Sequence, residues 1–415
     1  KNQAGRSPSS LLNARSRSGQ LMAVPVRVIA ALALLVFILL SGCESSGEAE
    51  GGARGRQGDG GGADTLATAG GSAATRGWGT AKGRWHRGSW QEVPPEQEQQ
   101  LTREQLMEFE RLRSIGYLPG SSPAPINTGV VVYDGARTYD GLNFYTSGHS
   151  PSATLMDMAG ERLHTWEMSF NEAWDLQPGD VPPRSIKSAG FWRRAYLFES
   201  GDVLAIFDNV GIVKVDKHSQ LIWARFDGFH HDLEVAPDGR IYTLVREPRI
   251  IPELHSEKPI LEDFVVVLDA DGNELSRVSV YEALRDSDFA YLLADLGESG
   301  DVFHTNTVEL LKGRLEGRVP GFEAGNVLIC IRQLSVIAVI DMSEGKAVWG
   351  MDGHWGKPHQ PTVLDNGHIL IFDNRGNRGR SQVIEFDPVR LRATWIYRGE
   401  KPDDFYSREC GSNQR

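Results

Sequence analysis

Short apolar runs alternate with glycine-containing turns from about Gly129 to the end of the chain. One recurring unit is a strand, a turn with glycine and a second strand, as in residues 196–206, 232–242 and 361–371. A second unit begins with a strand that ends in Asp and closes with a strand that often ends in Trp. Together the two units predict four antiparallel strands per repeat. The five repeats that we count end near Trp166, Trp223, Val280, Trp349 and Trp395.

This repetition predicts an all-β protein built as a β-propeller. Four-stranded repeats of about 40–60 residues are typical of propeller blades, whereas a β-sandwich would explain the strands but not their repetition. Residues from Gly411 onward have the pattern of the start of another repeat. Because a propeller that lacks a blade leaves sheet edges exposed, we expect six blades over residues 121–415, with the last blade truncated.

An amphipathic helix is predicted before the repeats, within residues 94–120. Pro94 and Pro95 open this stretch, and Thr102 with Gln105 has the spacing of a capping box. We expect this helix to dock on the main domain, because its apolar residues recur at helical spacing. They are Leu101, Leu106, Phe109, Leu112 and Ile115.

An export signal is predicted near the start of the chain. Arg27 is followed by 13 apolar residues and then by Ser41, Gly42 and Cys43. Such a run is short for a membrane span, which needs about 20 residues, but is typical of a signal peptide. We expect a lipoprotein signal peptide over residues 22–42, with Cys43 as the lipid attachment point. A transmembrane anchor is the alternative.

The segments on either side of this signal are expected to lack a fold. Residues 1–21 precede Met22, the first plausible start, and we interpret them as a non-native upstream segment. Residues 43–93 are rich in Gly, Ser and Ala, which favours a disordered tether. The protein would then be exported to the periplasm or cell envelope and held at the membrane through its N-terminal lipid.

The net charge of the chain bears on which kind of molecule the protein can bind. The chain carries 44 Lys+Arg against 55 Asp+Glu, for a formal net charge of −11. This acidic balance argues against a nucleic-acid binder, whose surface would be basic. Three cysteines in 415 residues exclude a disulfide-stapled scaffold.

Three histidines stand at the start of the first strand of three successive repeats. They are His231, His304 and His359, separated by 73 and 55 residues, about one repeat each. The innermost strand of each propeller blade faces the central channel, so we expect the three imidazoles to converge there. Imidazoles in a channel suit either a metal such as Fe or Zn or the transfer of an anionic group. Arg332 in the blade of His304 favours the second chemistry, because guanidinium binds sulfate or phosphate oxygens.

Four motifs in this order closely resemble bacterial arylsulfate sulfotransferases over roughly residues 125–415. They are His231-Asp-Leu-Glu, the run 301–307 with His304 and Asn306, the strand ending in Arg332, and the run 359–374 that begins at His359. The resemblance implies a six-bladed propeller without a cofactor or metal. It also implies transfer of a sulfuryl group from an aryl sulfate donor to a phenolic acceptor, by a ping-pong route without a nucleotide donor.

The resemblance also implies roles for single residues. His359 matches the histidine that is transiently sulfated, and His231, His304 and Arg332 match residues around the sulfate. Asn306 matches a hydrogen-bonding neighbour, and His304 would protonate the leaving phenolate and later deprotonate the acceptor. The partners would be small phenolic donors and acceptors. The alternatives are a histidine-ring metalloenzyme and a non-catalytic propeller that binds a ligand or a protein.

Overall fold

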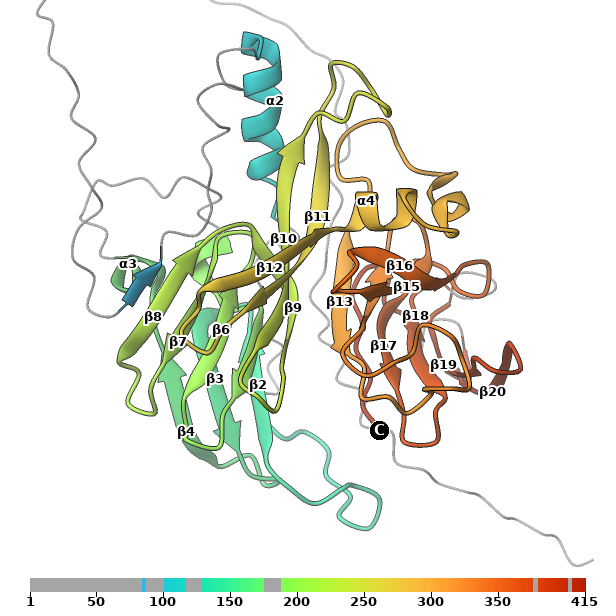
Figure 1. The fold of residues 1–415 in the computed structure, drawn as a ribbon. Coiled ribbons are helices and arrows are strands. Elements are labelled where there is room, and N and C mark those ends of the chain that lie inside the picture. Colours follow the sequence, from blue (N-terminus) through green and yellow to red (C-terminus); the bar gives the residue numbers. More distant parts are fainter. Residues whose placement is uncertain (1–83, 87–100, 117–128, 175–187, 376–379, 402–404) are drawn as a thin grey trace, which may run out of the picture.

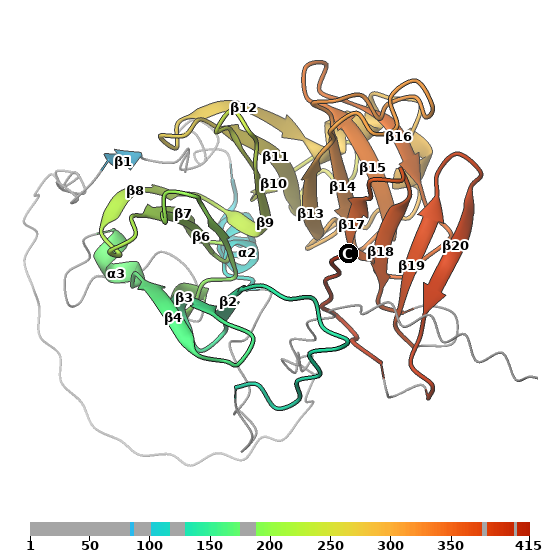
Figure 2. The ribbon, with the colours of Figure 1, turned by 90° about the horizontal axis from the view of Figure 1, so that it is seen from below.

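The structure, a computed structural model, describes residues 84–86, 101–116, 129–174, 188–375, 380–401 and 405–415. Its strands form five sheets that follow one another around a common axis (Figure 1, Figure 2). Neighbouring strands within each sheet are antiparallel, apart from one added edge strand. The chain is therefore an all-β propeller, and we number the five sheets as blades 1 to 5 in chain order.

The strand bounds follow the predicted repeats. Blade 1 has three strands: β2 (Asn143–Ser147), β3 (Ser150–Met156) and β4 (Arg162–Glu167). Blade 2 has β5 (Arg194–Leu197), β6 (Val203–Phe207), β7 (Gly211–Val215) and β8 (Leu221–Phe226). Blade 3 has β9 (Phe229–Val235), β10 (Ile241–Arg249), β11 (Ile260–Leu268) and β12 (Glu274–Ser279). Blade 4 has β13 (Thr305–Leu310), β14 (Val327–Ile331), β15 (Val336–Asp341) and β16 (Lys346–Met351). Blade 5 has β17 (His359–Val363), β18 (Ile369–Asp373), β19 (Gln382–Asp387) and β20 (Arg392–Tyr397).

The prediction of six blades is wrong for the described residues, which form five. Residues 411–415, expected to begin a sixth blade, form no strand. They lie instead against blade 5, where the backbone N–H and side chain of Asn413 donate to the side chain and carbonyl of Gln360. No neighbouring strand within the described residues offers this segment a backbone ladder.

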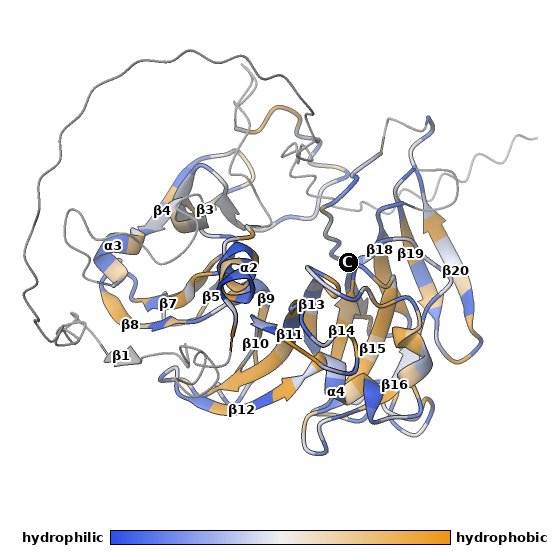
Figure 3. Ribbon diagram, turned by 90° about the horizontal axis from the view of Figure 1, so that it is seen from above, coloured by the Kyte–Doolittle hydropathy of each residue, from blue (hydrophilic) through white to orange (hydrophobic). Residues whose placement is uncertain are grey.

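The core lies between neighbouring blades. Leu204 and Ile206 of blade 2 belong to one apolar cluster with Ile241 and Val266 of blade 3. A second such cluster joins blades 4 and 5. Figure 3 shows apolar residues concentrated along the strands. Each sheet thus buries its faces against the next sheet, as the repeated apolar runs predict.

Side chains also tie the inner strands of adjacent blades together. The carboxylate of Glu234 on β9 accepts the backbone N–H of Leu310 on β13 at 2.5 Å. Glu309 on β13 accepts the backbone N–H of Val363 on β17 at 3.0 Å. Because burial disfavours its charged form, the pKa of Glu309 is raised to about 8. A hydrogen bond from a backbone N–H to a glutamate side chain of the preceding blade therefore links blade 3 to blade 4 and blade 4 to blade 5.

Few helices accompany the sheets. The described helices are α2 (Arg103–Arg113), α3 (Phe170–Ala173) and α4 (Val280–Arg285), with 3₁₀ turns η1 (Ser188–Gly190) and η2 (Ala290–Leu293). None of the helices in the described ranges is long and apolar enough to cross a membrane.

Helix α2 begins at the expected capping box. The hydroxyl of Thr102 accepts the backbone N–H of Gln105, and the side-chain oxygen of Gln105 accepts the backbone N–H of Thr102. Phe109 and Leu112 are buried on its inner face. The helix packs on β10 and β11 of blade 3. The residues that follow the helix are also held to blade 3, because Arg246 of β10 donates to the carbonyl of Ile115.

Strand β1 (Arg84–His86) lies within residues 43–93, for which the sequence predicts a disordered tether. These three residues pair in parallel with β8, the outer strand of blade 2. An outer strand presents unpaired backbone groups that a passing segment can bind. The other predicted leader segments, including Cys43, lie outside the described residues.

Candidate active site

The three predicted histidines lie at or next to the beginning of the inner strands β9, β13 and β17, and the pairing of each of these strands is irregular there. The register with the second strand shifts near His231, between Thr305 and Thr307, and after His359. The inner strand β5 of blade 2, by contrast, pairs with β6 without a shift. An extra residue on one strand turns the local side chains and increases the twist.

The backbone is strained at the same points. His231 and His304 have φ of 55° and 53°, in the left-handed region that few non-glycine residues adopt. Gln360, directly after His359, has φ of 43°. Such strain costs about 1–3 kcal/mol per residue and clusters at functional sites. The bulges and the strain together point the histidines away from the regular face of the sheet.

A pocket of about 160 Å³ lies at this end of the inner strands. His231, His304 and Arg332, all expected at the site, line it. His359 and Asn306, also expected, are buried nearby but are not among its lining residues. The other lining residues are Arg193, Asp301, Gln333, Glu409 and Cys410.

His231 and His304 face each other across one side of the pocket. Their ring centroids are 4.9 Å apart, in an edge-to-face arrangement. The Nδ1 atom of His304 lies 2.8 Å from the Asp301 carboxylate. Burial lowers the pKa of both histidines, to well below the usual value for His231, whose pKa the charge of Arg193 lowers further. Both rings are therefore neutral near pH 7.

The tautomer of His359 follows from its neighbours. Asn374, at the end of β18, donates its side-chain N–H groups to the carbonyls of Ser407 and Cys410. Its amide oxygen therefore faces Nδ1 of His359, at 2.6 Å. Because that oxygen can only accept, Nδ1 carries the proton and Nε2 carries the lone pair. Burial, followed by the charge of Arg332, lowers the pKa of His359 to about 3.

Asn306 connects blade 4 to the segment before His359. Its side-chain N–H donates to the carbonyl of Pro358 at 2.9 Å, and its oxygen accepts the hydroxyl of Thr307. The same Thr307 hydroxyl accepts the backbone N–H of Gln360 at 2.9 Å. In this structure Asn306 thus holds the strand that carries His359.

Two arginines that line the pocket each have one buried N–H donor without a hydrogen-bond partner in the described residues. Within the described residues, Nε of Arg332 and Nη1 of Arg193 are buried and have no hydrogen-bond partner. The backbone N–H of Arg332 donates to the carbonyl of His304, which places the two residues side by side. Nε of Arg193 lies 3.7 Å from the buried carboxylate of Asp208. The pair can bind an anionic group such as a sulfate ester.

Arg193 was not predicted from the sequence, although a signal was present. It directly precedes β5, the inner strand of blade 2, at the position where blades 3 to 5 carry a histidine. The next residue, Arg194, instead pairs with Asp232 at 2.9 Å. Comparing the first inner-strand position across all repeats, rather than the histidines alone, would have found Arg193.

The last residues of the chain form one wall of the pocket. Glu409 and Cys410 line it, and Gly411 packs so closely on the ring of Phe372 that a side chain there would clash. Cys330 and Cys410, both described, are not joined by a disulfide. The buried thiol of Cys330 donates to the carbonyl of Pro358 instead, and burial raises its pKa well above the usual value.

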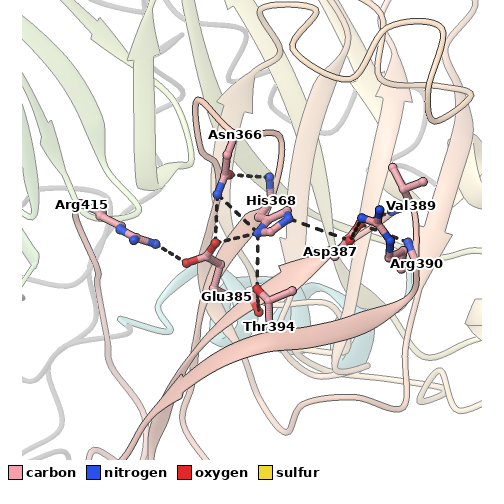
Figure 4. A network of polar contacts seen from close by, with 8 residues as sticks. All are labelled: Asn366, His368, Glu385, Asp387, Val389, Arg390, Thr394 and Arg415. Atoms are coloured by element: carbon pink, nitrogen blue, oxygen red, sulfur yellow. Dashed lines mark hydrogen bonds and ion pairs between the residues drawn. The ribbon is translucent and has the colours of Figure 1, made fainter. Parts of the chain in front are cut away.

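Other clusters of polar side chains in the described ranges lie apart from the pocket. Nowhere in these ranges do three or more His, Cys, Asp or Glu side chains gather in an arrangement that could hold a metal ion. A separate polar network surrounds His368 on blade 5, where its Nδ1 lies 2.6 Å from Glu385 (Figure 4). None of the residues labelled in that view lines the pocket.

Comparison with known proteins gives one family match. The family model described as "Arylsulfotransferase (ASST)" matches residues 195–415, which include all five predicted site residues. A search of curated proteins gives no match.

Several solved structures resemble the fold at low identity. A streptogramin B lyase is 12% identical, with a TM-score of 0.39, over 63% of this chain and 67% of that one. A catalytically inactive virginiamycin B lyase from Staphylococcus aureus is 10% identical, with a TM-score of 0.37, over 64% and 71%. BamB from Moraxella catarrhalis is 12% identical, with a TM-score of 0.31, over 64% and 62%. At this level of similarity, these structures support no inference about function.

Proposed function

Because this chain belongs to the arylsulfotransferase family, we propose that it moves a sulfuryl group from an aryl sulfate to a phenol through a sulfo-histidine at His359. The observation that carries the proposal is the tautomer of His359. With Nδ1 bonded to Asn374, the ring offers Nε2 as a neutral nucleophile. Its lowered pKa, about 3, maintains this form at any pH near neutrality.

The first half-reaction breaks the donor's S–O bond. The lone pair on Nε2 of His359 attacks sulfur, an N–S bond forms, and the phenolate leaves with the electrons of the S–O bond. Negative charge spreads over the three sulfuryl oxygens, much as in phosphoryl transfer. Arg332 and Arg193 supply donors for those oxygens. The leaving phenolate takes a proton from one of the two facing imidazoles, His231 and His304. The family resemblance implies His304 for this step.

The second half-reaction returns the enzyme to its starting state. A phenol oxygen attacks sulfur, the N–S bond breaks, and His359 regains its lone pair. The phenol's proton goes to the imidazole that gave one in the first step. No nucleotide, metal or other cofactor enters this balance.

The experiment that tests this function uses the purified chain with 4-nitrophenyl sulfate and a phenol. We expect nitrophenol release that depends on the phenol, parallel lines in double-reciprocal plots, and a trapped enzyme heavier by one SO₃ group at His359. Intersecting lines, or no modified His359 after incubation with donor alone, would overturn the covalent route. If no aryl sulfate tested releases its phenol, the result would favour a non-catalytic propeller that binds a ligand or a protein.

Arg193 provides a prediction about donor affinity. Replacing Arg193 with Gln should raise KM for the aryl sulfate roughly 10- to 100-fold, because a hydrogen bond to a charged group contributes about 1.5–3 kcal/mol. Steady-state kinetics with Arg194→Gln as the matched control provides the measurement, since Arg194 pairs with Asp232 and does not line the pocket. Equal changes in both variants would show that Arg193 has no special contact with the donor.

Export and lipid attachment at Cys43 remain part of the proposal. They are supported by the sequence of residues 22–43 alone. Labelling of cells with a radioactive fatty acid should mark the protein, and Cys43→Ser should abolish the label and release the protein from membranes. Labelling that survives in Cys43→Ser would exclude this attachment site.

A further inference from the structure

We propose that Asp263, His230 and His231 form a buried proton relay that supplies and takes back the proton exchanged with the phenols. The inference rests on the proposed sulfuryl transfer and refines it. It assigns the acid–base step to His231, in place of the assignment of that step to His304.

The relay runs from the pocket into the interior of blade 3. His231 lines the pocket, and His230 lies behind it with no exposed surface. Their Nδ1 atoms are 2.8 Å apart. Since two lone pairs would repel at this distance, one Nδ1 donates and the other accepts. The protonation of one ring therefore determines the tautomer of the other.

Asp263 of β11 lies at the inner end of the relay. Its Oδ1 is 3.7 Å from Nε2 of His230, and both side chains are fully buried. Its other oxygen accepts the backbone N–H of Thr305 at 2.6 Å, which fixes the carboxyl group between blades 3 and 4. Proton transfer requires Oδ1 and Nε2 to close to about 2.9 Å.

Two protonation states of the relay, which differ by one proton in total, follow from this geometry. In the acid form, Asp263 is protonated and donates to His230 Nε2, His230 Nδ1–H donates to His231 Nδ1, and His231 carries its proton on Nε2. In the base form, Asp263 is ionised, His230 Nε2–H donates to it, His231 Nδ1–H donates to His230, and His231 Nε2 carries a lone pair. The two forms differ by the single proton on His231 Nε2.

The catalytic cycle uses each form once. When His231 Nε2–H gives its proton to the leaving phenolate, His230 passes a proton to His231 and Asp263 passes one to His230. The second phenol then gives its proton to His231 Nε2, and the relay returns to the acid form. Protons balance over the two half-reactions, and both rings are neutral at each resting point.

The surroundings suit a proton stored on the carboxyl group rather than on a ring. Arg246, Arg193 and His304 face the two histidines, and burial together with these charges lowers the pKa of His230 well below its usual value. The backbone carbonyl of Val245 partly opposes this shift. Burial, followed by the charge of Asp301, raises the pKa of Asp263 to about 7. A protonated Asp263 beside two neutral imidazoles is therefore accessible near neutral pH.

His304 is less suited to donate the proton. Its Nδ1 faces the Asp301 carboxylate at 2.8 Å, so the neutral ring carries its proton there and only a lone pair on Nε2. It could act as an acid only as an imidazolium, which its burial disfavours. His231 can donate without any ring becoming charged.

The test compares donors whose phenols differ in acidity, because a poor leaving group depends on an acid more than a good one does. Asp263→Asn keeps an oxygen for Thr305 but cannot release a proton. We expect it to slow transfer from phenyl sulfate, whose phenol has a pKa of about 10, by roughly 100-fold or more. The burst of nitrophenol from 4-nitrophenyl sulfate should change less than about threefold. The matched control is Glu262→Gln, the adjacent buried carboxyl of β11, which binds Arg249 and Ser279 instead.

Two further variants distinguish the possible outcomes. His230→Phe keeps a ring but cuts the relay, so it should show the same selective loss even if Asp263→Asn folds poorly. Equal losses with both donors would make Asp263 and His230 merely structural and overturn the relay. Selective loss in Asp301→Asn, with none in Asp263→Asn, would assign the acid to His304 and also overturn it. A wild-type enzyme without any nitrophenol burst would instead contradict the proposed covalent route, and the relay with it.

Discussion

His359→Ala should lose sulfuryl transfer, with kcat lowered at least about 1,000-fold. The variant keeps the pocket, both arginines and the His231–His304 pair, but it lacks the atom that forms the N–S bond. Binding alone cannot replace this step, because a direct transfer would need two phenols in the pocket at once. Nitrophenol release with saturating acceptor measures the effect, and mass spectrometry should show that the variant takes up no SO₃ group.

His368→Ala is the control for that experiment. His368 lies on the same blade and contacts Glu385, but it belongs to the network of Figure 4 and not to the pocket. We expect it to retain wild-type kcat. If His359→Ala kept even a tenth of the wild-type rate, the nucleophile would have to be another residue.

Acid should unfold this protein more steeply than a typical propeller, because four buried histidines must become charged when it unfolds. The pKa is lowered in the folded state for His230, His231, His304 and His359, in each case mainly by burial, and reaches about 3 for His359. In the unfolded chain each histidine takes a proton below about pH 6.5. Below about pH 6.5 the unfolded state therefore binds more protons at these sites than the folded state does, and their contribution to stability falls as the pH falls, down to about pH 3 for His359.

Buried carboxyl groups oppose this trend at higher pH. Asp263 and Glu309 have pKa values raised to about 7 and about 8, so the folded state holds protons that the unfolded state has lost. Their contribution falls as the pH rises from about 4 to 8. Between about pH 4.5 and 6.5 this pH dependence of the carboxyl contribution partly cancels that of the histidine contribution. Below that range the carboxyl contribution no longer changes with pH. Below that range, each histidine that is still neutral in the folded state lowers the stability by about 1.4 kcal/mol per pH unit.

Urea unfolding between pH 3.5 and 9 measures this profile. We expect the midpoint to be highest in weakly acidic solution, to fall gradually above pH 7, and to fall sharply below pH 4.5. His359→Gln removes one of the four protons and should make the acid limb shallower. An acid limb that is as steep in His359→Gln as in the wild type would contradict the buried, neutral state of His359.

The strands were predictable because each repeat obeys local rules. The predicted repeat ends at Trp166, Trp223, Trp349 and Trp395 fall within β4, β8, β16 and β20. Alternating apolar positions and turn glycines determine such strands without knowledge of distant residues. The five repeats counted in the sequence correspond to the five blades of the described residues, whereas the start of a sixth blade, expected from Gly411 onward, was wrong because that segment forms no strand.

The site was predicted where it repeats and missed where it depends on distant contacts. His231, His304 and His359 stand out because they recur at one position of the repeat. Asn374 and Asp263 give no such signal, since each acts on a histidine from another strand. Their roles follow from one buried hydrogen bond, between Asn374 and His359, and from one buried close approach, between Asp263 and His230, which the three-dimensional structure alone brings together.

The bonds from Glu234 to Leu310 and from Glu309 to Val363 make those two backbone amides unusual. Each N–H belongs to an inner strand but is bonded to a carboxylate of the preceding blade rather than to its own sheet. Its exchange with solvent deuterium therefore requires two blades to part, whereas exchange within a blade requires strands to separate. The hydrogen-exchange rates of these two amides should therefore measure how often the propeller opens between blades 3 and 4 and between blades 4 and 5.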